Sequence, residues 1–261
     1  QVLPRLYEHF QFRAIVHKTA ITFGLAESIL AATIADWENA LPDYLHLAYL
    51  PNANNIRLRL SAYDVDREKA AAEIDRQFAL LDRVIPYRII GYGDATLESA
   101  VGELLRRNGE SVAVAESCTG GNIAHRFTLQ AGASEYFMGG VVAYSNDVKC
   151  ALLGVDPEAL AREGAVSQTV AEQMAEGVRK ATGATYGIST TGIAGPGGGT
   201  PEKPVGTVWM AVSGPQGTVS HKMQFESLRS QNIERASSHA INLLRLRLCG
   251  APDDGLWTIK Y

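Results

Sequence analysis

Residues 114–121 read Val-Ala-Glu-Ser-Cys-Thr-Gly-Gly, and they join an apolar run to a helical one. The run 111–115 predicts a buried strand, and residues 122–127 predict a helix. A serine at such a turn sits on rigid backbone beside the free N–H groups of the helix start. Ser117 therefore suits a nucleophile next to an oxyanion or phosphate site. The alternative is that Ser117 or Thr119 only caps the helix.

Two further segments place polar groups at the end of an apolar run. Residues 138–144 predict a strand that ends at Tyr144, and a short helix from Asn146 carries Lys149. Residues 186–191 predict a strand that runs into a glycine-rich loop through Thr200. Hydroxyls, a lysine and loop glycines at three strand ends are what an open α/β sheet offers a ligand at its carboxyl edge.

These motifs carry a family resemblance. AESCTGG (115–121), YSNDVK (144–149) and TGIAGPGGG (191–199) occur in this order, followed by Pro-Val-Gly-Thr-Val at 204–208. In combination they resemble the C-terminal domain of the competence-damage-inducible CinA family, the domain of nicotinamide mononucleotide (NMN) amidase. The resemblance covers about residues 96–261. Residues 1–95 resemble the KH-type middle domain of long CinA proteins.

The expected fold is α/β, in two domains. Residues 1–95 predict a small α+β domain of order βαββαβ, starting with a strand at 12–22 and closing with one at 87–90. A glycine-rich stretch at 91–95 marks the boundary. Residues 96–261 predict a three-layer α/β/α domain. Its sheet is mixed, because residues 206–212 and 218–225 predict a hairpin, and a long helix at 230–248 closes it.

The resemblance implies an amide hydrolysis. Ser117 would attack the carboxamide carbon of NMN, ammonia would leave, and water would release nicotinate mononucleotide from the acyl-enzyme. A serine needs a nearby base, and the family motif places Tyr144 and Lys149 in that role. Lysine acts as a base only when its pKa is lowered. From the residues alone, the favoured interpretation of Lys149 is an exposed surface lysine, and Cys118 remains an alternative nucleophile.

Substrate-binding groups are expected around the same strand ends. Backbone N–H groups of residues 119–121 would stabilise the oxyanion, and the loop 191–199 would bind phosphate and ribose unless it is merely a surface turn. Glu116 would orient Lys149 or Tyr144, or pair with an arginine. The family has an arginine near this point that can contact substrate. Arg229 stands there but lacks the acidic residue that often precedes that arginine, so both Arg229 and Arg235 remain candidates, and Arg235 is otherwise a residue of the helix surface. The expected binding residues are Glu116, Thr119, Gly120, Gly121, Thr191, Gly192, Gly195, Gly197, Gly198 and Arg229.

Composition limits the partners. The chain has 261 residues, a formal net charge of −4 and 46% hydrophobic residues, which argues against broad nucleic-acid binding. No apolar run approaches a membrane span, and the three cysteines form no metal pattern, so we expect a cytoplasmic protein without metal or cofactor. It begins with Gln1, which predicts a processed chain or a fragment. The resemblance implies NMN as substrate, pyridine-nucleotide salvage and a homodimer. The alternative function is a catalytically silent nucleotide-binding module.

Overall fold

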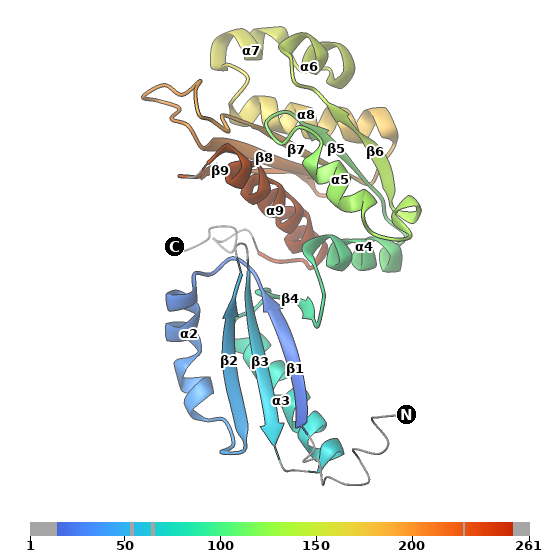
Figure 1. The fold of residues 1–261 in the computed structure, drawn as a ribbon. Coiled ribbons are helices and arrows are strands. Elements are labelled where there is room, and N and C mark those ends of the chain that lie inside the picture. The colour runs from blue at the N-terminus through green and yellow to red at the C-terminus, as the bar shows by residue number, and fades with distance from the viewer. Residues whose placement is uncertain (1–14, 53–54, 64–65, 227, 253–261) are drawn as a thin grey trace, which may run out of the picture. The chain divides into compact units, whose positions relative to one another are not determined.

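The computed structural model describes residues 15–52, 55–63, 66–226 and 228–252, and the chain divides into two compact units between Thr96 and Leu97. Unit 1 has the predicted order βαββαβ (Figure 1). Residues 12–14 of the first predicted strand lie outside the described part of the chain. The elements are β1 (Ile15–Thr22), α2 (Glu27–Asn39), β2 (Leu45–Pro51), β3 (Ile56–Tyr63), α3 (Arg67–Val84) and β4 (Ile89–Tyr92).

The sheet of unit 1 is antiparallel, with strand order β2-β3-β1-β4. Alternation along β3 explains how it packs. Leu58 and Leu60 join the core under α2 and α3, whereas Arg59 lies exposed on the opposite face. This period of two is the pattern expected for a strand with one buried face. The predicted α+β arrangement of this unit is confirmed.

Unit 2 is built on a five-stranded mixed sheet with strand order β6-β5-β7-β8-β9. The pairs β5–β6 and β5–β7 are parallel, and the last two pairs are antiparallel, as the predicted hairpin requires. The strands are β5 (Val112–Glu116), β6 (Phe137–Val142), β7 (Tyr186–Gly192), β8 (Thr207–Gly214) and β9 (Gly217–Gln224).

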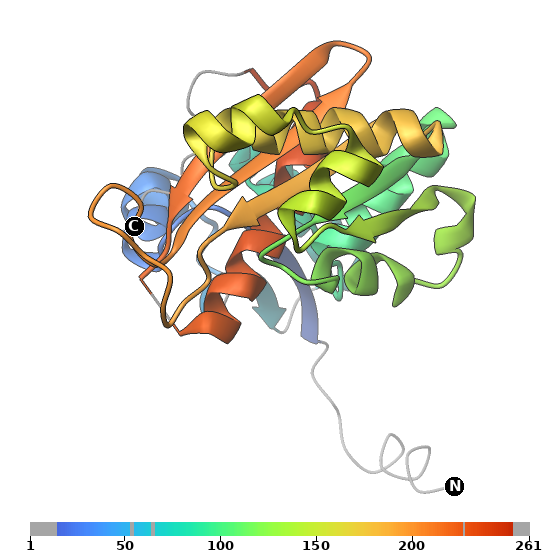
Figure 2. The same ribbon diagram turned by 90° about the horizontal axis from the view of Figure 1, so that it is seen from above.

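Helices cover both faces of this sheet, which confirms the predicted three layers. Helix α8 (Gln168–Thr182) packs on one face, and α6 (Asn146–Leu153) and α7 (Pro157–Glu163) lie against α8 (Figure 1). The view from above shows α8 lying over the strands (Figure 2). The helices α4 (Leu97–Asn108), α5 (Asn122–Thr128) and α9 (Arg229–Leu248) belong to the other face. Helix α7 was not expected from the sequence.

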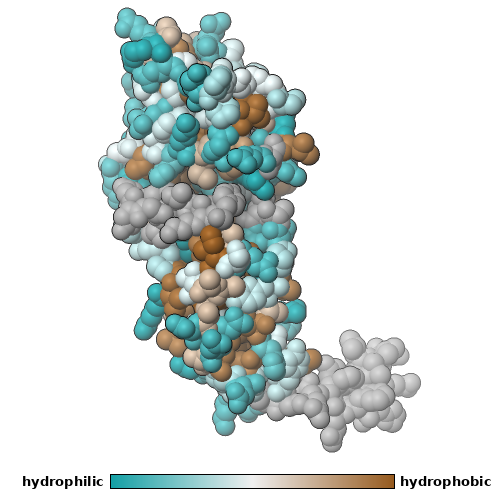
Figure 3. Space-filling model, turned by 90° about the vertical axis from the view of Figure 1, so that its left-hand side faces the viewer, coloured by the Kyte–Doolittle hydropathy of each residue, from teal (hydrophilic) through white to brown (hydrophobic). Residues whose placement is uncertain are grey.

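Surface and burial agree with this layering. Hydrophobic and hydrophilic side chains are interspersed over both units in the space-filling view (Figure 3). All five residues of β5 are buried, because helices cover both faces of this interior strand. Within the described part of the chain, no helix has the length and apolar character needed to span a bilayer.

Candidate active site

Ser117 lies directly after β5, at the topological switch point of the sheet. From β5 the chain passes through α5 to β6 on one side, and β7 pairs with β5 on the other. In open α/β sheets, ligands bind outside the carboxyl ends of strands at such a switch point. The backbone N–H of Ser117 donates to the Thr190 carbonyl at 2.9 Å, which fastens the turn to β7. Ser117 is 9% exposed.

Lys149 reaches Ser117 from the helical layer formed by α6, α7 and α8. It lies on α6, whose start is capped by the Ser145 hydroxyl, and it is only 1% exposed. Its Nζ lies 3.2 Å from Ser117 Oγ, 2.8 Å from the Ala143 carbonyl oxygen and 3.2 Å from the Tyr144 carbonyl oxygen. Across the described ranges, no carboxylate forms an ion pair with it. Burial therefore lowers the pKa of Lys149, because its charged form loses solvation without a counter-ion.

The contacts of Lys149 fit a neutral amine. A neutral amine has two N–H donors and one lone pair. In the structure Nζ donates to both carbonyl oxygens and to the Ser117 hydroxyl. When the amine is neutral, the two carbonyls still accept its N–H bonds and the lone pair faces the Ser117 hydroxyl. A general base needs this kind of placement beside the hydroxyl that it deprotonates.

Tyr144 contacts Lys149 through its backbone rather than its side chain. Its carbonyl accepts from Lys149, whereas its hydroxyl lies 3.5 Å from Arg229 Nη2. The side chain is 65% exposed and borders the cavity described next. The expected serine–tyrosine–lysine set is therefore present as a serine–lysine pair, with the tyrosine hydroxyl at the cavity rim beside an arginine.

A cavity of about 210 Å³ opens in front of Ser117. Its residues come from the turn after β5, the β6–α6 connection, α6, the α7–α8 connection, β7 with the loop that follows it, and α9. Sequence reasoning did not single out Asn146, Ala165, Val166 and Ala194 as site residues. Ala165 and Val166 carry no polar side chain, so no sequence signal could have marked them. The lining residues are Ser117, Cys118, Tyr144, Asn146, Lys149, Ala165, Val166, Thr191, Gly192, Ala194 and Arg229.

Arg229 begins α9 and borders the cavity, whereas Arg235 does not line it. Its Nη1 donates to the Gly195 carbonyl at 2.7 Å. This contact holds the guanidinium between the glycine-rich loop and Tyr144. Arg229 is therefore the cation available to a ligand in the cavity.

The loop after β7 contributes only its first part to the cavity. Thr191 and Gly192 line it, but the Thr191 hydroxyl is used in a 2.8 Å bond to the Ala165 carbonyl. A Cβ at Gly192 would lie 2.7 Å from the Thr207 carbonyl oxygen, so only glycine fits there. Gly195 contributes its carbonyl to Arg229, whereas Gly197 and Gly198 do not line the cavity. The expected phosphate contacts of these two glycines therefore find no support in the cavity geometry.

The turn 117–121 differs from the expected oxyanion site. The Gly120 N–H donates to the Ser117 carbonyl at 3.2 Å, and the Gly121 N–H donates to Glu116 Oε2 at 3.0 Å. Both donors are already used inside the turn, so the expectation that they face a ligand does not hold. Glu116 also does not orient Lys149, Tyr144 or an arginine, because its described contacts are all with the turn and α5.

Cys118 does not compete with Ser117. Burial raises the pKa of the Cys118 thiol to about 12, so the thiol stays protonated at neutral pH. The thiolate, which is the reactive form of cysteine, is therefore disfavoured at Cys118.

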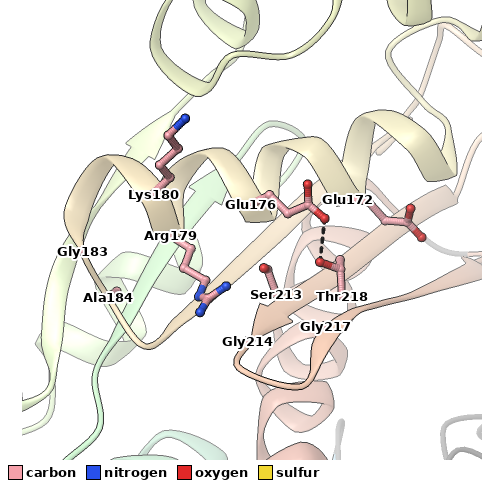
Figure 4. A pocket seen from close by; sticks show the side chains of 10 residues that line it. All are labelled: Glu172, Glu176, Arg179, Lys180, Gly183, Ala184, Ser213, Gly214, Gly217 and Thr218. Atoms are coloured by element: carbon pink, nitrogen blue, oxygen red, sulfur yellow. Dashed lines mark hydrogen bonds between the residues drawn. The ribbon is translucent and has the colours of Figure 1, made fainter.

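A second pocket of about 850 Å³ lies between α8 and the β8–β9 hairpin (Figure 4). It is larger than the cavity at Ser117 but contains no residue of the serine–lysine site. Its carboxylates are engaged, since Glu176 accepts from the Thr218 hydroxyl and Glu172 from the Ser220 hydroxyl. Lys180 points away from the strands (Figure 4). Size alone therefore does not mark the reactive site.

Taken together, the units define a two-domain α/β protein. A small antiparallel α+β unit precedes a three-layer unit that carries a serine–lysine pair at the carboxyl edge of its sheet. Family models support both units. The CinA C-terminal domain matches residues 94–248, and the damage-inducible protein CinA KH domain matches residues 17–87. The chain belongs to the CinA family.

Individual relatives agree with this assignment. A CinA-like protein of Cytophaga hutchinsonii is 44% identical over 94% of this chain and 58% of its own length. A CinA-like protein of Salinibacter ruber is 45% identical over 95% of this chain and 60% of its own length. The chain thus spans about three-fifths of these relatives. The crystal structure of a competence/damage-inducible protein from Agrobacterium tumefaciens is 39% identical, with a TM-score of 0.57, over 59% of this chain and 93% of that one.

Proposed function

We propose that unit 2 hydrolyses the carboxamide of NMN to nicotinate mononucleotide and ammonia, with Ser117 as nucleophile and Lys149 as general base. One observation carries the proposal. The buried Lys149 amine lies 3.2 Å from Ser117 Oγ, with its N–H donors directed to two backbone carbonyls and with a lowered pKa. This arrangement supplies a serine with a proton acceptor, which acyl transfer requires.

The reaction follows from these atoms in two halves. Ser117 Oγ bonds to the carboxamide carbon while Lys149 takes the hydroxyl proton and the carbonyl oxygen receives the electron pair. The tetrahedral intermediate collapses, the C–N bond breaks, and ammonia leaves with the proton from Lys149. Water then attacks the acyl carbon and loses a proton to Lys149. The bond between the acyl carbon and Ser117 Oγ breaks, Lys149 returns that proton to Ser117 Oγ, and the acid product leaves and ionises to the carboxylate.

The dimensions of the cavity support a small aromatic amide in front of Ser117. About 210 Å³ is below the ~300–1,000 Å³ typical of sites that enclose drug-sized ligands. The cavity therefore accommodates the pyridine ring and its amide, while the ribose phosphate extends to the rim. Arg229 and Tyr144 stand at that rim, and a guanidinium is the usual partner of a phosphate group.

Ammonia release from NMN tests the proposal, with the Ser117→Ala variant beside the wild type. We expect release by the wild type and a loss of at least about 10⁴-fold in kcat for Ser117→Ala, as for other serine nucleophiles. Thermal unfolding should show that the variant remains folded, and calorimetry should show that it still binds NMN. A folded wild type that binds NMN and releases no ammonia would favour the silent nucleotide-binding module instead.

A further inference from the structure

The carboxylate of Glu116 is buried at the end of β5 and collects four hydrogen bonds. Oε2 accepts from the Thr119 hydroxyl at 2.6 Å and from the N–H groups of Gly121 and Ile123 at 3.0 Å each. Oε1 accepts from the Ala124 N–H at 2.8 Å. The residue is 1% exposed and forms no ion pair with any described cation. The carboxylate therefore satisfies N–H groups at the start of α5 that would otherwise lack a partner within the helix.

These contacts determine which N–H groups of the turn stay open. Gly120 and Asn122 donate to the Ser117 and Thr119 carbonyls, and the next N–H groups of α5 donate to Glu116. Ser117 donates to Thr190. The N–H groups of Cys118 and Thr119 have no acceptor in another described residue. Cys118 lines the cavity, whereas Thr119, the next residue of the turn, is 3% exposed and does not line it. Between positions 117 and 124, this leaves two adjacent donors next to the nucleophile.

We propose that Glu116 is a positioning residue that orders the turn so that the N–H groups of Cys118 and Thr119 form the oxyanion site for Ser117. The inference rests on the proposed acyl transfer. It replaces the donors expected at Gly120 and Gly121, which are used inside the turn. Donors fixed in place before reaction are the most effective, because they need no reorganisation as negative charge develops on the carbonyl oxygen.

The shape and charge of Glu116 both matter for this role. A glutamine would present one oxygen and one NH₂ group to a set of four donors, so at least one N–H would face another N–H. An unsatisfied buried donor is costly, and the turn would shift to relieve it. Thr119 extends the arrangement, because its hydroxyl also lies 2.7 Å from the Thr190 hydroxyl on β7. Glu116 thereby links the turn to both α5 and the neighbouring strand.

Glu116→Gln tests the positioning role through kinetics. We expect kcat for ammonia release to fall about 10²–10³-fold, the usual loss when an oxyanion donor is removed, with KM little changed. The pH at which kcat/KM rises should stay that of the wild type, since Lys149 does not contact Glu116. Glu98→Gln is the matched control, because Glu98 is also a buried carboxylate and pairs with Arg126 instead of the turn. It should lower the melting temperature and leave kcat intact.

A second readout separates this inference from the amidase proposal. A fluorophosphonate reacts with an activated serine: the Ser117 Oγ–P bond forms, the P–F bond breaks, fluoride leaves and Lys149 takes the proton. The reaction needs the oxyanion site but not NMN. We expect slower labelling of Glu116→Gln than of wild type and Glu98→Gln. A wild type that labels at Ser117 without releasing ammonia would refute the amidase alone.

Other outcomes overturn the positioning role. Labelling and turnover of Glu116→Gln at the wild-type rate would do so. A Glu116→Gln variant with a lowered melting temperature and an unchanged kcat would also do so. A shifted pH dependence would show instead that Glu116 acts through Lys149. If Glu116→Gln does not fold, Thr119→Val decides, because it removes one of the four donors and keeps the side-chain shape. It should slow labelling in the same direction by a smaller factor, and an unchanged rate would refute the inference. A wild type that neither labels nor releases ammonia would refute both proposals.

Discussion

Lys149 and Ser117 come from different layers of unit 2, and their side chains meet at 3.2 Å between Nζ and Oγ. Ser117 follows β5, whereas Lys149 comes from α6, which packs on α8. Both residues line the cavity, and the lysine is buried. Packing of a helix therefore creates the buried environment that lowers the pKa of this lysine.

The first prediction concerns pH. Because burial lowers the pKa of Lys149, its neutral form is reached below the usual lysine value of about 10.4. kcat/KM for NMN should therefore rise with pH along an acidic limb whose midpoint lies below that value. The measurement is ammonia release across a pH series. Lys149→Arg keeps hydrogen-bond donors but stays protonated, so it should be inactive throughout. An acidic limb that persists in Lys149→Arg would assign the base to another group.

The second prediction concerns stability and follows from the same group. The pKa of Lys149 is lower in the folded state than in the unfolded chain, so the unfolded state binds more protons between the two values. The free energy of unfolding contributed by this group must then rise as pH increases through that interval. Lys149→Met lacks the group. The wild type should therefore gain stability relative to Lys149→Met as pH approaches about 10.4.

Urea unfolding of both proteins at several pH values measures this difference. Surface groups titrate alike in the two proteins and cancel in the comparison. A difference that stays flat from neutral pH to the usual lysine pKa would contradict a lowered pKa for Lys149.

The third prediction concerns Arg229. Loss of its charge should raise KM for NMN about tenfold or more, since hydrogen bonds to charged groups contribute about 1.5–3 kcal/mol. Nicotinamide riboside lacks the phosphate, so Arg229→Gln should change its KM much less. Steady-state kinetics with both substrates make this comparison. Arg235→Gln is the control, because Arg235 lies on the same helix without lining the cavity. Equal effects on the two substrates would exclude a phosphate contact.

Local structure could be predicted from short sequence patterns, whereas contacts between residues far apart in the chain could not. The strand and helix around Ser117, the order of unit 1 and the β8–β9 hairpin follow from periodicity and turn residues, and the structure has all three. The partners of Glu116 were missed because residues 119–124 look like an ordinary helix start in the sequence. Ala165 and Val166 were missed as cavity residues, because their place depends on the path of the connection between α7 and α8.

Tyr144 shows the same limit at the level of one side chain. Its position beside Lys149 in the sequence suggested that the two side chains work together. The chain instead turns so that the Tyr144 carbonyl meets the amine and the hydroxyl meets Arg229. Short spacing predicts that two residues are near each other, but backbone geometry decides which of their atoms make contact.

The last prediction tests how helix packing supports the site. Gly177 lies in α8 where the end of α6 crosses it, and a Cβ there would lie 1.9 Å from the Leu153 carbonyl oxygen. Alanine normally stabilises a helix by about 1 kcal/mol relative to glycine. Gly177→Ala should instead destabilise unit 2 by about 1–3 kcal/mol, the usual cost of overpacking.

The same substitution should reduce activity, because α6 must shift and it carries Lys149. Urea unfolding and ammonia release measure the two effects in one protein. Lys180→Ala, an exposed position on the same helix, serves as the control and should change neither by much. A Gly177→Ala variant that is more stable than wild type would show that α6 and α8 are not in close contact at Leu153. A variant that is less stable but fully active would show that the position of Lys149 does not depend on that contact.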